Sequence, residues 1–318
     1  MPFIFNMQAA NRRGLAVAGA LLLVYVVWGT TYFAMGIALE TMPPLLMNAV
    51  RFLCAGAVML LVALAQGHAL PTRTQWRNSA VVGGLMVFLA MNCIGFAQKF
   101  GIGSGLMATV VTTMPMWLAL WTHGGGEKVP ATSWAGLALG VVGALLLALE
   151  GDFSASGWGA LLAFGAPLCW SIGSYASRRL SLPPPAMASA AQWLVGGMMG
   201  LVVALWFEPV QQLGHASARS WLAWGYLLVM GTLVALNAYL WLLQNTSAAL
   251  AGSYSFVNPA VALLAGVALG GERLTGWVFA ALPLMGAALA LILYGAALAG
   301  LWRGRLQRPG VWGWLLYK

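Results

Sequence analysis

Long apolar runs, separated by short polar or turn-forming breaks, make up most of this chain. A helix of about 20 residues crosses the hydrocarbon core of a bilayer, and the runs are close to that length. Strands of a membrane barrel would instead alternate polar and apolar positions over about ten residues. The pattern therefore predicts an all-α polytopic membrane protein with ten transmembrane helices, at 15–39, 45–65, 78–98, 104–122, 132–149, 158–178, 186–207, 220–243, 248–269 and 276–300.

The composition supports the same class. Hydrophobic residues make up 61% of the 318 residues, charged residues make up 7%, and the mean hydropathy is +0.86. Soluble domains carry about 25% charged residues, so a water-soluble fold is excluded. The run at 14–39 is too long for the apolar part of a signal peptide and is predicted to be the first span. Cys54, Cys93 and Cys169 lie inside apolar runs, without the spacing of a disulfide framework.

The basic residues that give the net charge of +9 are distributed unevenly between the two sides of the predicted spans, and this bias indicates the topology. With the N-terminus inside, three basic residues fall on the outer side: Lys99, Arg219 and Arg273. Eleven fall on the inner side: Arg12, Arg13, Arg73, Arg77, Lys128, Arg178, Arg179, Arg303, Arg305, Arg308 and Lys318. Cytoplasmic loops of membrane proteins carry such an excess. Both termini are therefore predicted to be cytoplasmic, and the charge requires no nucleic-acid partner.

The second half of the chain repeats positions of the first in the same order. Ala90-Met91-Asn92 matches Ala235-Leu236-Asn237, and Gly126-Glu127-Lys128 matches Gly271-Glu272-Arg273. Pro115 similarly matches Pro259, and Trp28 matches Trp170. Each half holds five predicted spans, and an odd number inverts the second copy in the membrane. The chain is thus divided into a first five-helix repeat (14–150), a second, inverted repeat (151–300) and a cytoplasmic or interfacial tail (301–318). Inverted repeats build alternating-access transporters with a central cavity.

The chain resembles the drug/metabolite transporter (DMT) superfamily in its ten-helix EamA-type exporter branch. The resemblance rests on Trp28-Gly29-Thr30-Thr31-Tyr32-Phe33-Ala34, on Arg51-Phe52, and on the Pro115 to Lys128 and Asn258 to Arg273 blocks. It covers roughly residues 14–300. It implies a basket of ten helices with a cavity lined by spans 1, 3, 4, 6, 8 and 9, and with spans 5 and 10 at the edge. Members of the branch are mostly bacterial inner-membrane exporters of amino acids, other metabolites or toxic compounds.

Polar and aromatic residues deep in the runs are the candidates for solute binding. Asn92 and Asn237 occupy matching positions, and each amide has two readings: a helix–helix hydrogen bond or a contact to solute in a cavity. Asn237, Trp241 and Gln244 share one helical face, as do Asn92, Phe96 and Lys99. The predicted substrate-binding set is Trp28, Tyr32, Asn92, Thr113, Trp117, Trp170, Ser174, Asn237, Trp241, Tyr254 and Asn258.

Three further residues inside spans have two readings each. Pro115 and Pro259 must kink their helices because proline removes a backbone hydrogen bond, and they form either static kinks or a pair of hinges for alternating access. Arg51 cannot relay protons, since arginine stays charged in proteins. It either extends toward the membrane surface and pairs with carbonyl groups, or it supplies a fixed charge for a carboxylate-bearing solute.

Enzymatic chemistry has no candidate residues here. The six acidic residues and the three histidines fall near span ends or in loops, so no nucleophile, base or metal constellation can be placed on facing helices. The prediction is no enzyme, no cofactor and no metal. The lack of an acid deep in a span also favours transport down the solute gradient without obligatory proton coupling.

The sequence therefore predicts an inner-membrane exporter of small amphiphilic metabolites, above all amino acids including bulky or aromatic ones. Rings would stack on Trp and Tyr, and polar ends would meet amides and hydroxyls. The alternative is a broad-specificity drug or toxic-compound efflux transporter, with proton coupling as an option. The expected partners are the solute and the lipid bilayer. The protein is expected as a monomer or a weak dimer, the latter through the Gly136/Gly140 pair.

Overall fold

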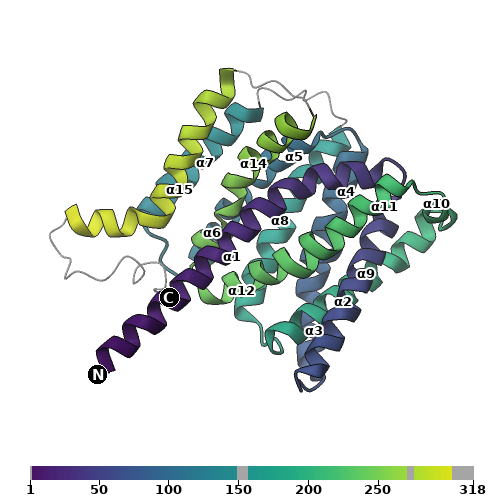
Figure 1. Ribbon diagram of the computed structural model, residues 1–318, viewed down its shortest axis with the longest axis horizontal. Coiled ribbons are helices and arrows are strands. Elements are labelled where there is room, and N and C mark those ends of the chain that lie inside the picture. The colour runs from purple at the N-terminus through teal and green to yellow at the C-terminus, as the bar shows by residue number, and fades with distance from the viewer. Residues whose placement is uncertain (1, 149–156, 271–275, 303–318) are drawn as a thin grey trace.

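The structure, a computed structural model, describes residues 2–148, 157–270 and 276–302, and every regular element within them is helical (Figure 1). The elements are α1 (Pro2–Leu39), α2 (Pro44–Ala65), α3 (Arg73–Gly83), η1 (Gly84–Ala90), α4 (Met91–Lys99), α5 (Ser104–Val111), α6 (Met114–Gly124), α7 (Ala131–Ala148), α8 (Gly157–Arg179), α9 (Pro185–Phe207), α10 (Gln211–Gly214), α11 (Ala218–Tyr226), η2 (Leu227–Leu236), α12 (Asn237–Asn245), α13 (Ala248–Gly252), α14 (Tyr254–Gly270) and α15 (Gly276–Trp302).

Helices occupy the ranges that the apolar runs predict, apart from turns at residues 112–113 and 253 and from residue 149, which lies outside the described residues. Within those residues, six uninterrupted stretches are long and apolar enough to cross a membrane: Arg13–Leu39, Pro44–Ala65, Arg73–Lys99, Gly157–Arg179, Pro185–Phe207 and Ala218–Asn245. The multi-pass membrane architecture is therefore confirmed. The other four predicted spans correspond to the α5–α6 and α13–α14 pairs and to α7 and α15.

Two predicted spans are broken helices. Residues 112–113 form a turn between α5 and α6, and Ser253 forms one between α13 and α14. Pro115 lies at the start of α6, where its missing N–H costs nothing. At both turns the backbone makes tighter bonds to the residue three positions earlier, such as Phe256 N–H to the Ser253 carbonyl at 3.1 Å. The apolar pattern alone gave no sign of these breaks.

Two other spans contain a π-helical segment at matching places. Segment η1 ends shortly before Asn92, and η2 ends directly before Asn237. In each case the asparagine amide donates to the carbonyl four residues earlier, that of Phe88 at 2.7 Å and that of Leu233 at 2.9 Å. Wider turns misalign backbone groups, and a nearby amide can satisfy the carbonyls that are left over.

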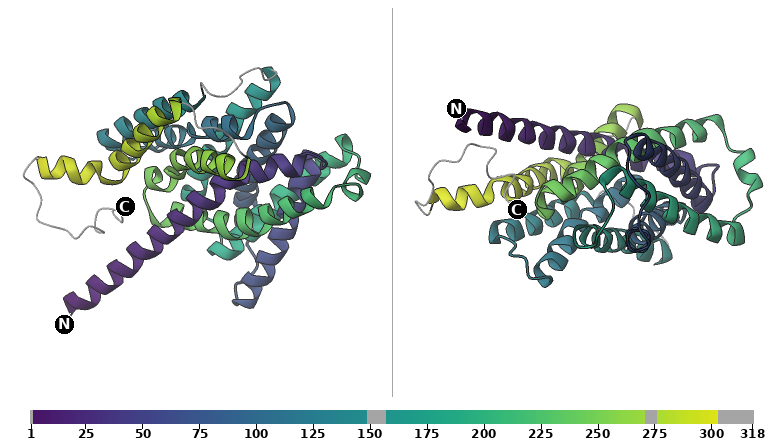
Figure 2. Two further views of the ribbon diagram at one scale, coloured as in Figure 1. Left: turned by 45° about the horizontal axis from the view of Figure 1, so that its top comes forward. Right: turned by 90° about the horizontal axis from the view of Figure 1, so that it is seen from below.

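Equivalent helices of the two halves pack against each other. The most extensive pairs are α2 with α9 and α7 with α15, and the second pair lies at one edge of the molecule (Figure 1). Helix α1 packs on α14 and on the α11–η2–α12 stretch, whereas α8 packs on α5, α6 and the α3–η1–α4 stretch. This exchange of partners is what a two-fold relation between the halves requires. The N-terminal part of α1 projects beyond the bundle (Figure 2).

Candidate solute-binding site

A pocket lies where α1 meets helices of both halves. Its lining residues are Trp28, Thr31, Tyr32 and Met35 of α1, Arg51 and Phe52 of α2, Met91 and Ile94 of α4, Val111, Met114, Ala166, Pro167 and Trp170 of α5, α6 and α8, Leu227, Gly231, Thr232 and Leu236 of η2, and Tyr254 of α14. The EamA resemblance did not imply a contribution from span 2, which α2 makes here.

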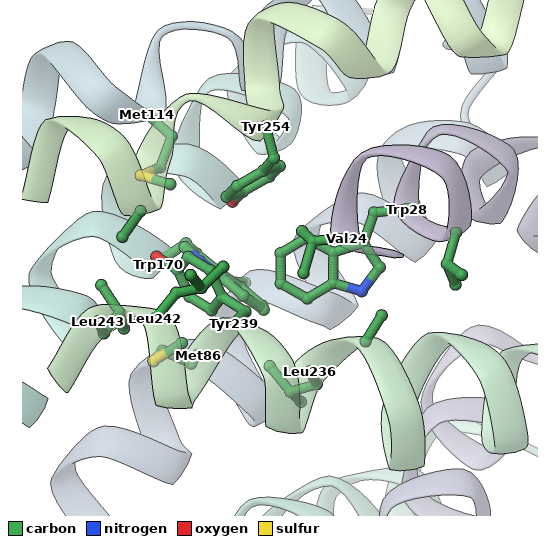
Figure 3. Packing of buried hydrophobic residues seen from close by; sticks show 14 of the residues in the cluster. Val24, Trp28, Met86, Met114, Trp170, Leu236, Tyr239, Leu242, Leu243 and Tyr254 are labelled. Carbon is green, nitrogen blue, oxygen red and sulfur yellow. The ribbon is translucent and has the colours of Figure 1, made fainter. Parts of the chain in front are cut away.

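Four aromatic rings meet at one side of this pocket. Trp28 lies 5.5 Å from Trp170, 5.1 Å from Tyr239 and 4.8 Å from Tyr254, measured between ring centroids. Figure 3 shows the Trp28 ring reaching from α1 toward the other three. The Trp28 contacts with Trp170 and Tyr254 are edge-to-face, as is the contact between Tyr239 and Tyr254, and this is the arrangement that aromatic quadrupoles favour. A single ring of the first half is therefore held among three rings of the second half.

Hydrogen bonds fix these rings in place. The Trp28 indole N–H donates to the Gly231 carbonyl at 3.0 Å, and the Tyr239 and Ser174 hydroxyls lie 2.9 Å apart. The Trp170 indole N–H has no acceptor in good hydrogen-bonding geometry, although it lies beside the Tyr239 side chain. A buried polar group without a full partner is costly, so the Trp170 indole N–H depends on its Tyr239 neighbour.

Among the described residues, Arg51 is the one that brings a formal charge into the pocket lining. Its side chain is 4% exposed, and no acidic residue within the described ranges forms an ion pair with it. Its contacts are weak: Nη2–H donates to the Met91 sulfur at 3.3 Å, the guanidinium carbon lies 4.4 Å from the Phe52 ring centroid, and Nε has no partner. Burying an uncompensated charge costs several kcal/mol. This is a charge in a pocket wall, not one extended to the membrane surface.

Two threonine hydroxyls in the lining, one on α1 and one on η2, add hydrogen-bond acceptors to the pocket. Thr31 donates its hydroxyl proton to the Trp28 carbonyl at 2.8 Å, and Thr232 donates to the Leu227 carbonyl at 3.0 Å. Because each proton is used within its own helix, the lone pairs of the hydroxyl oxygens remain to accept a hydrogen bond. The lining thus combines one cation, aromatic surface and a few hydroxyl acceptors.

Four of the sequence-predicted residues line this pocket: Trp28, Tyr32, Trp170 and Tyr254. Ser174 does not line the pocket but forms a hydrogen bond with Tyr239, one of the four aromatic rings beside it. The lining also includes Thr31, Arg51, Phe52 and Thr232, which the predicted set leaves out. Arg51 had a readable signal, a lone charge within a span. The apolar lining residues had none, because apolar residues in a span look the same in sequence whether they pack or line a pocket.

Asn92 and Asn237 lie outside the lining of this pocket. The Asn48 amide donates to the Asn92 side-chain oxygen at 3.0 Å, and the Ser189 hydroxyl donates to that of Asn237 at 2.6 Å. Asn48 and Ser189 each lie four residues after the proline that begins their helix. The two contacts are therefore repeat-equivalent interhelical hydrogen bonds, and they favour that alternative over a solute contact. Asn237 also lines a smaller pocket with Trp241, Gln192 and Gln244.

The remaining predicted residues lie near the two helix breaks. Thr113 donates to the Val110 carbonyl at 2.8 Å, and Trp117 stacks on Trp121 with centroids 6.3 Å apart. Asn258 is fully buried, and in its satisfied orientation its amide donates to the Tyr25 and Tyr254 carbonyls. Pro115 packs closely against Gly252, so the break in one half contacts the break in the other. A hinge role for Pro115 and Pro259 stays a prediction.

The acidic residues in the described ranges lie at helix ends. Glu127 pairs with Arg179 at 3.1 Å and Glu40 with Arg219 at 3.6 Å. Glu208 accepts from the Leu45 and Leu46 N–H groups at the start of α2. Burial raises the pKa of Glu208, and the two N–H donors oppose that shift. Within the same ranges, no group of three His, Cys, Asp or Glu residues is placed to hold a metal ion.

Comparison with known proteins agrees with this architecture. The EamA-like transporter family model matches twice, at residues 15–149 and 157–294. The Escherichia coli protein named "Uncharacterized inner membrane transporter YedA" is 37% identical over 89% of this chain and 92% of its own length. The Salmonella typhimurium "Probable amino-acid metabolite efflux pump" is 28% identical over 86% and 93%.

A solved crystal structure shares the fold, with a TM-score of 0.73 at 24% identity over 90% of this chain and 99% of that one. The resemblance to EamA-type drug/metabolite transporters, drawn from the motifs, is therefore confirmed. Membrane transport is the coarse function that the family and the names of the two relatives indicate. With its two matched halves, the chain belongs to the EamA-like transporter family.

Proposed function

We propose that this protein exports small amphiphilic metabolites, among them amino acids with bulky or aromatic side chains, by alternating access through the central pocket. The observation that carries the proposal is the pocket itself, which joins five aromatic lining residues to one cation and several hydroxyls. Aromatic surface binds an apolar side chain, while polar groups orient the other end of the solute. The direction of transport follows the relatives named as efflux pumps.

The partner exchange between the halves supports alternating access. Helices α1 and α8 each pack on two spans of the opposite half. In an inverted repeat, the two halves can exchange conformations about their two-fold axis and expose the site on the other side of the membrane. The Trp28, Trp170, Tyr239 and Tyr254 rings join the halves beside the pocket, so they must separate or shift together when access changes.

The polarity of the pocket disfavours the alternative of cation efflux. A site for lipophilic cations gains from a carboxylate and from open aromatic faces. Here the lining carries a guanidinium, and none of its members within the described residues is acidic. Because acids in those residues lie at helix ends, transport is further proposed to run down the solute gradient, without obligatory proton coupling.

Counterflow in proteoliposomes tests the proposal. Vesicles loaded with unlabelled phenylalanine and diluted into labelled phenylalanine should show a transient overshoot of label, which a carrier gives and a channel does not. Trp170→Ala should reduce the rate roughly tenfold or more, since a buried aromatic contact of about 1–3 kcal/mol is lost. An imposed pH gradient alone should drive no accumulation.

Trp158→Ala is the matched control, because Trp158 is 71% exposed and is not among the residues that line the pocket. It should transport as the parent protein does. Counterflow of tetraphenylphosphonium with none of any amino acid or related metabolite would contradict the proposal and favour drug efflux. Uphill accumulation driven by a pH gradient would contradict the uncoupled mechanism alone.

A further inference from the structure

We propose that Arg51 is the anchor for a solute carboxylate, so that this pocket selects organic anions over neutral and cationic solutes of the same shape. The inference rests on the proposed transport through the pocket, and it names the recognition group. A planar guanidinium with unused donors matches a carboxylate in charge and in geometry.

The packing around Arg51 lacks a countercharge and a hydrogen-bond acceptor for Nε. The guanidinium contacts a thioether and a phenyl ring, and the Nε donor is buried without a partner. Neither neighbour compensates the charge as a carboxylate would. The side chain nevertheless lines the pocket, beside aromatic surface and hydroxyl groups. A solute carboxylate would therefore provide both the countercharge and the missing acceptor.

The second repeat argues against a purely structural role for the charge. Arg51 and Gln192 each lie seven residues after the proline that begins α2 and α9 respectively. Gln192 is also buried, at 3% exposure. The equivalent place in the fold thus accepts a neutral side chain. The positive charge is a property of this pocket and is not required by the packing of the repeat.

The rest of the lining determines which carboxylates fit. Trp28, Trp170 and Tyr254 provide surface for an apolar or aromatic body. An ammonium group would meet hydroxyl oxygens but no carboxylate, and it would lie in the field of Arg51. The expected order of affinity is therefore anion, then zwitterion, then neutral solute, with the cation last.

A phenylalanine series tests this order on the purified full-length protein by calorimetric titration and by inhibition of phenylalanine counterflow. The probes at neutral pH are N-acetylphenylalanine as the anion, phenylalanine as the zwitterion, N-acetylphenylalaninamide as the neutral form and phenethylamine as the cation. The anion should bind roughly ten- to a hundredfold more tightly than the neutral amide, which is the usual size of a charge-assisted contact.

Two variants then assign the preference to one residue. Arg51→Gln should lower affinity for the anion to that of the neutral amide and leave the amide unchanged. Arg51→Lys, which keeps the positive charge but loses the paired N–H donors of the planar guanidinium, should retain part of the preference for the anion. Arg219→Gln removes an arginine that is 66% exposed at its side chain and should change nothing, which excludes a general effect of net charge.

Equal binding of the anion and the neutral amide by the parent protein would overturn the inference, and so would an unchanged preference in Arg51→Gln. Both results leave the proposed transport function intact. If Arg51→Gln fails to fold, the parent protein and Arg51→Lys decide by the same ratio. Failure of all four probes to bind or to inhibit, together with absent phenylalanine counterflow, would overturn the proposed function as well.

Discussion

At the scale of single residues, most polar groups within the spans form hydrogen bonds with neighbouring groups of the protein. Hydrocarbon offers no hydrogen-bond partners, so an amide in a span must find one in the protein. Asn237 does so twice, through the Leu233 carbonyl and the Ser189 hydroxyl. Arg51 is different, because its charge lies in a pocket with no acidic partner in the described part of the chain. The contrast separates polar residues that hold helices together from Arg51, for which we propose a ligand-binding role.

The Ser189–Asn237 contact predicts a coupled loss of stability. Ser189→Ala and Asn237→Ala should each lower the free energy of unfolding, and their double-mutant cycle should give a coupling of about 0.6 kcal/mol, with about 1.7 kcal/mol as an upper value for such pairs in membranes. Unfolding by SDS in mixed micelles measures it. Folded Asn237→Ala should still transport phenylalanine, since Asn237 does not line the central pocket. Lost flux with unchanged stability would instead restore the solute-binding role that the sequence suggests.

At the scale of helices, close approach depends on glycines at particular positions. Gly83, at the end of α3, lies directly against α9, and a methyl group there would overlap the backbone carbonyl of Gln192. The adjacent Gly84 faces the flexible Met199 side chain at an ordinary contact distance of 3.5 Å. Both glycines have right-handed helical backbone angles, so space, and not conformation, distinguishes them.

Gly83→Ala and Gly84→Ala form a matched pair for this helix contact. Gly83→Ala should destabilise the protein by about 1–3 kcal/mol, because overpacking against a backbone carbonyl forces α3 and α9 apart. Gly84→Ala should be neutral or stabilising by up to about 1 kcal/mol, since alanine is the better helix former. Thermal unfolding of the two purified variants measures both effects. Equal effects in the pair would show that α3 and α9 do not approach at Gly83.

At the scale of the whole molecule, the helix packing of the two halves corresponds more closely than their amino-acid residues do. The pairs α2–α9 and α7–α15 join equivalent spans, and α1 and α8 exchange partners. The family model likewise matches each half separately. These observations support the proposed inverted repeat, whose defining property is that corresponding loops of the two halves lie on opposite sides of the membrane.

The basic-residue count predicts which side each loop occupies, and accessibility labelling can test it. Thr74→Cys and Gln211→Cys place thiols at exposed positions at the start of α3 and in α10, in a background where Cys54, Cys93 and Cys169 are replaced. A membrane-impermeant maleimide added to intact cells should label the Gln211 position, while the Thr74 position should react only after permeabilisation. Labelling of both from the same side would contradict the ten-span topology.

The sequence by itself determined the membrane class, the helix ranges, the internal repeat and the family. These depend on composition and on local pattern, which hydrocarbon constrains strongly because every backbone group must be satisfied within a helix. It also indicated four of the pocket residues, since Trp28, Tyr32, Trp170 and Tyr254 are aromatic groups well inside spans.

Only the tertiary structure decided which polar residues share a pocket. Asn92 and Arg51 look alike in the sequence, as isolated polar residues within apolar runs, yet one pairs with Asn48 and the other faces the pocket without a countercharge. A helical pattern fixes the face on which a side chain lies, but not which neighbour meets that face. That choice depends on how α2, α4 and α9 cross, and the crossing is set by contacts far apart in the chain, such as the one at Gly83.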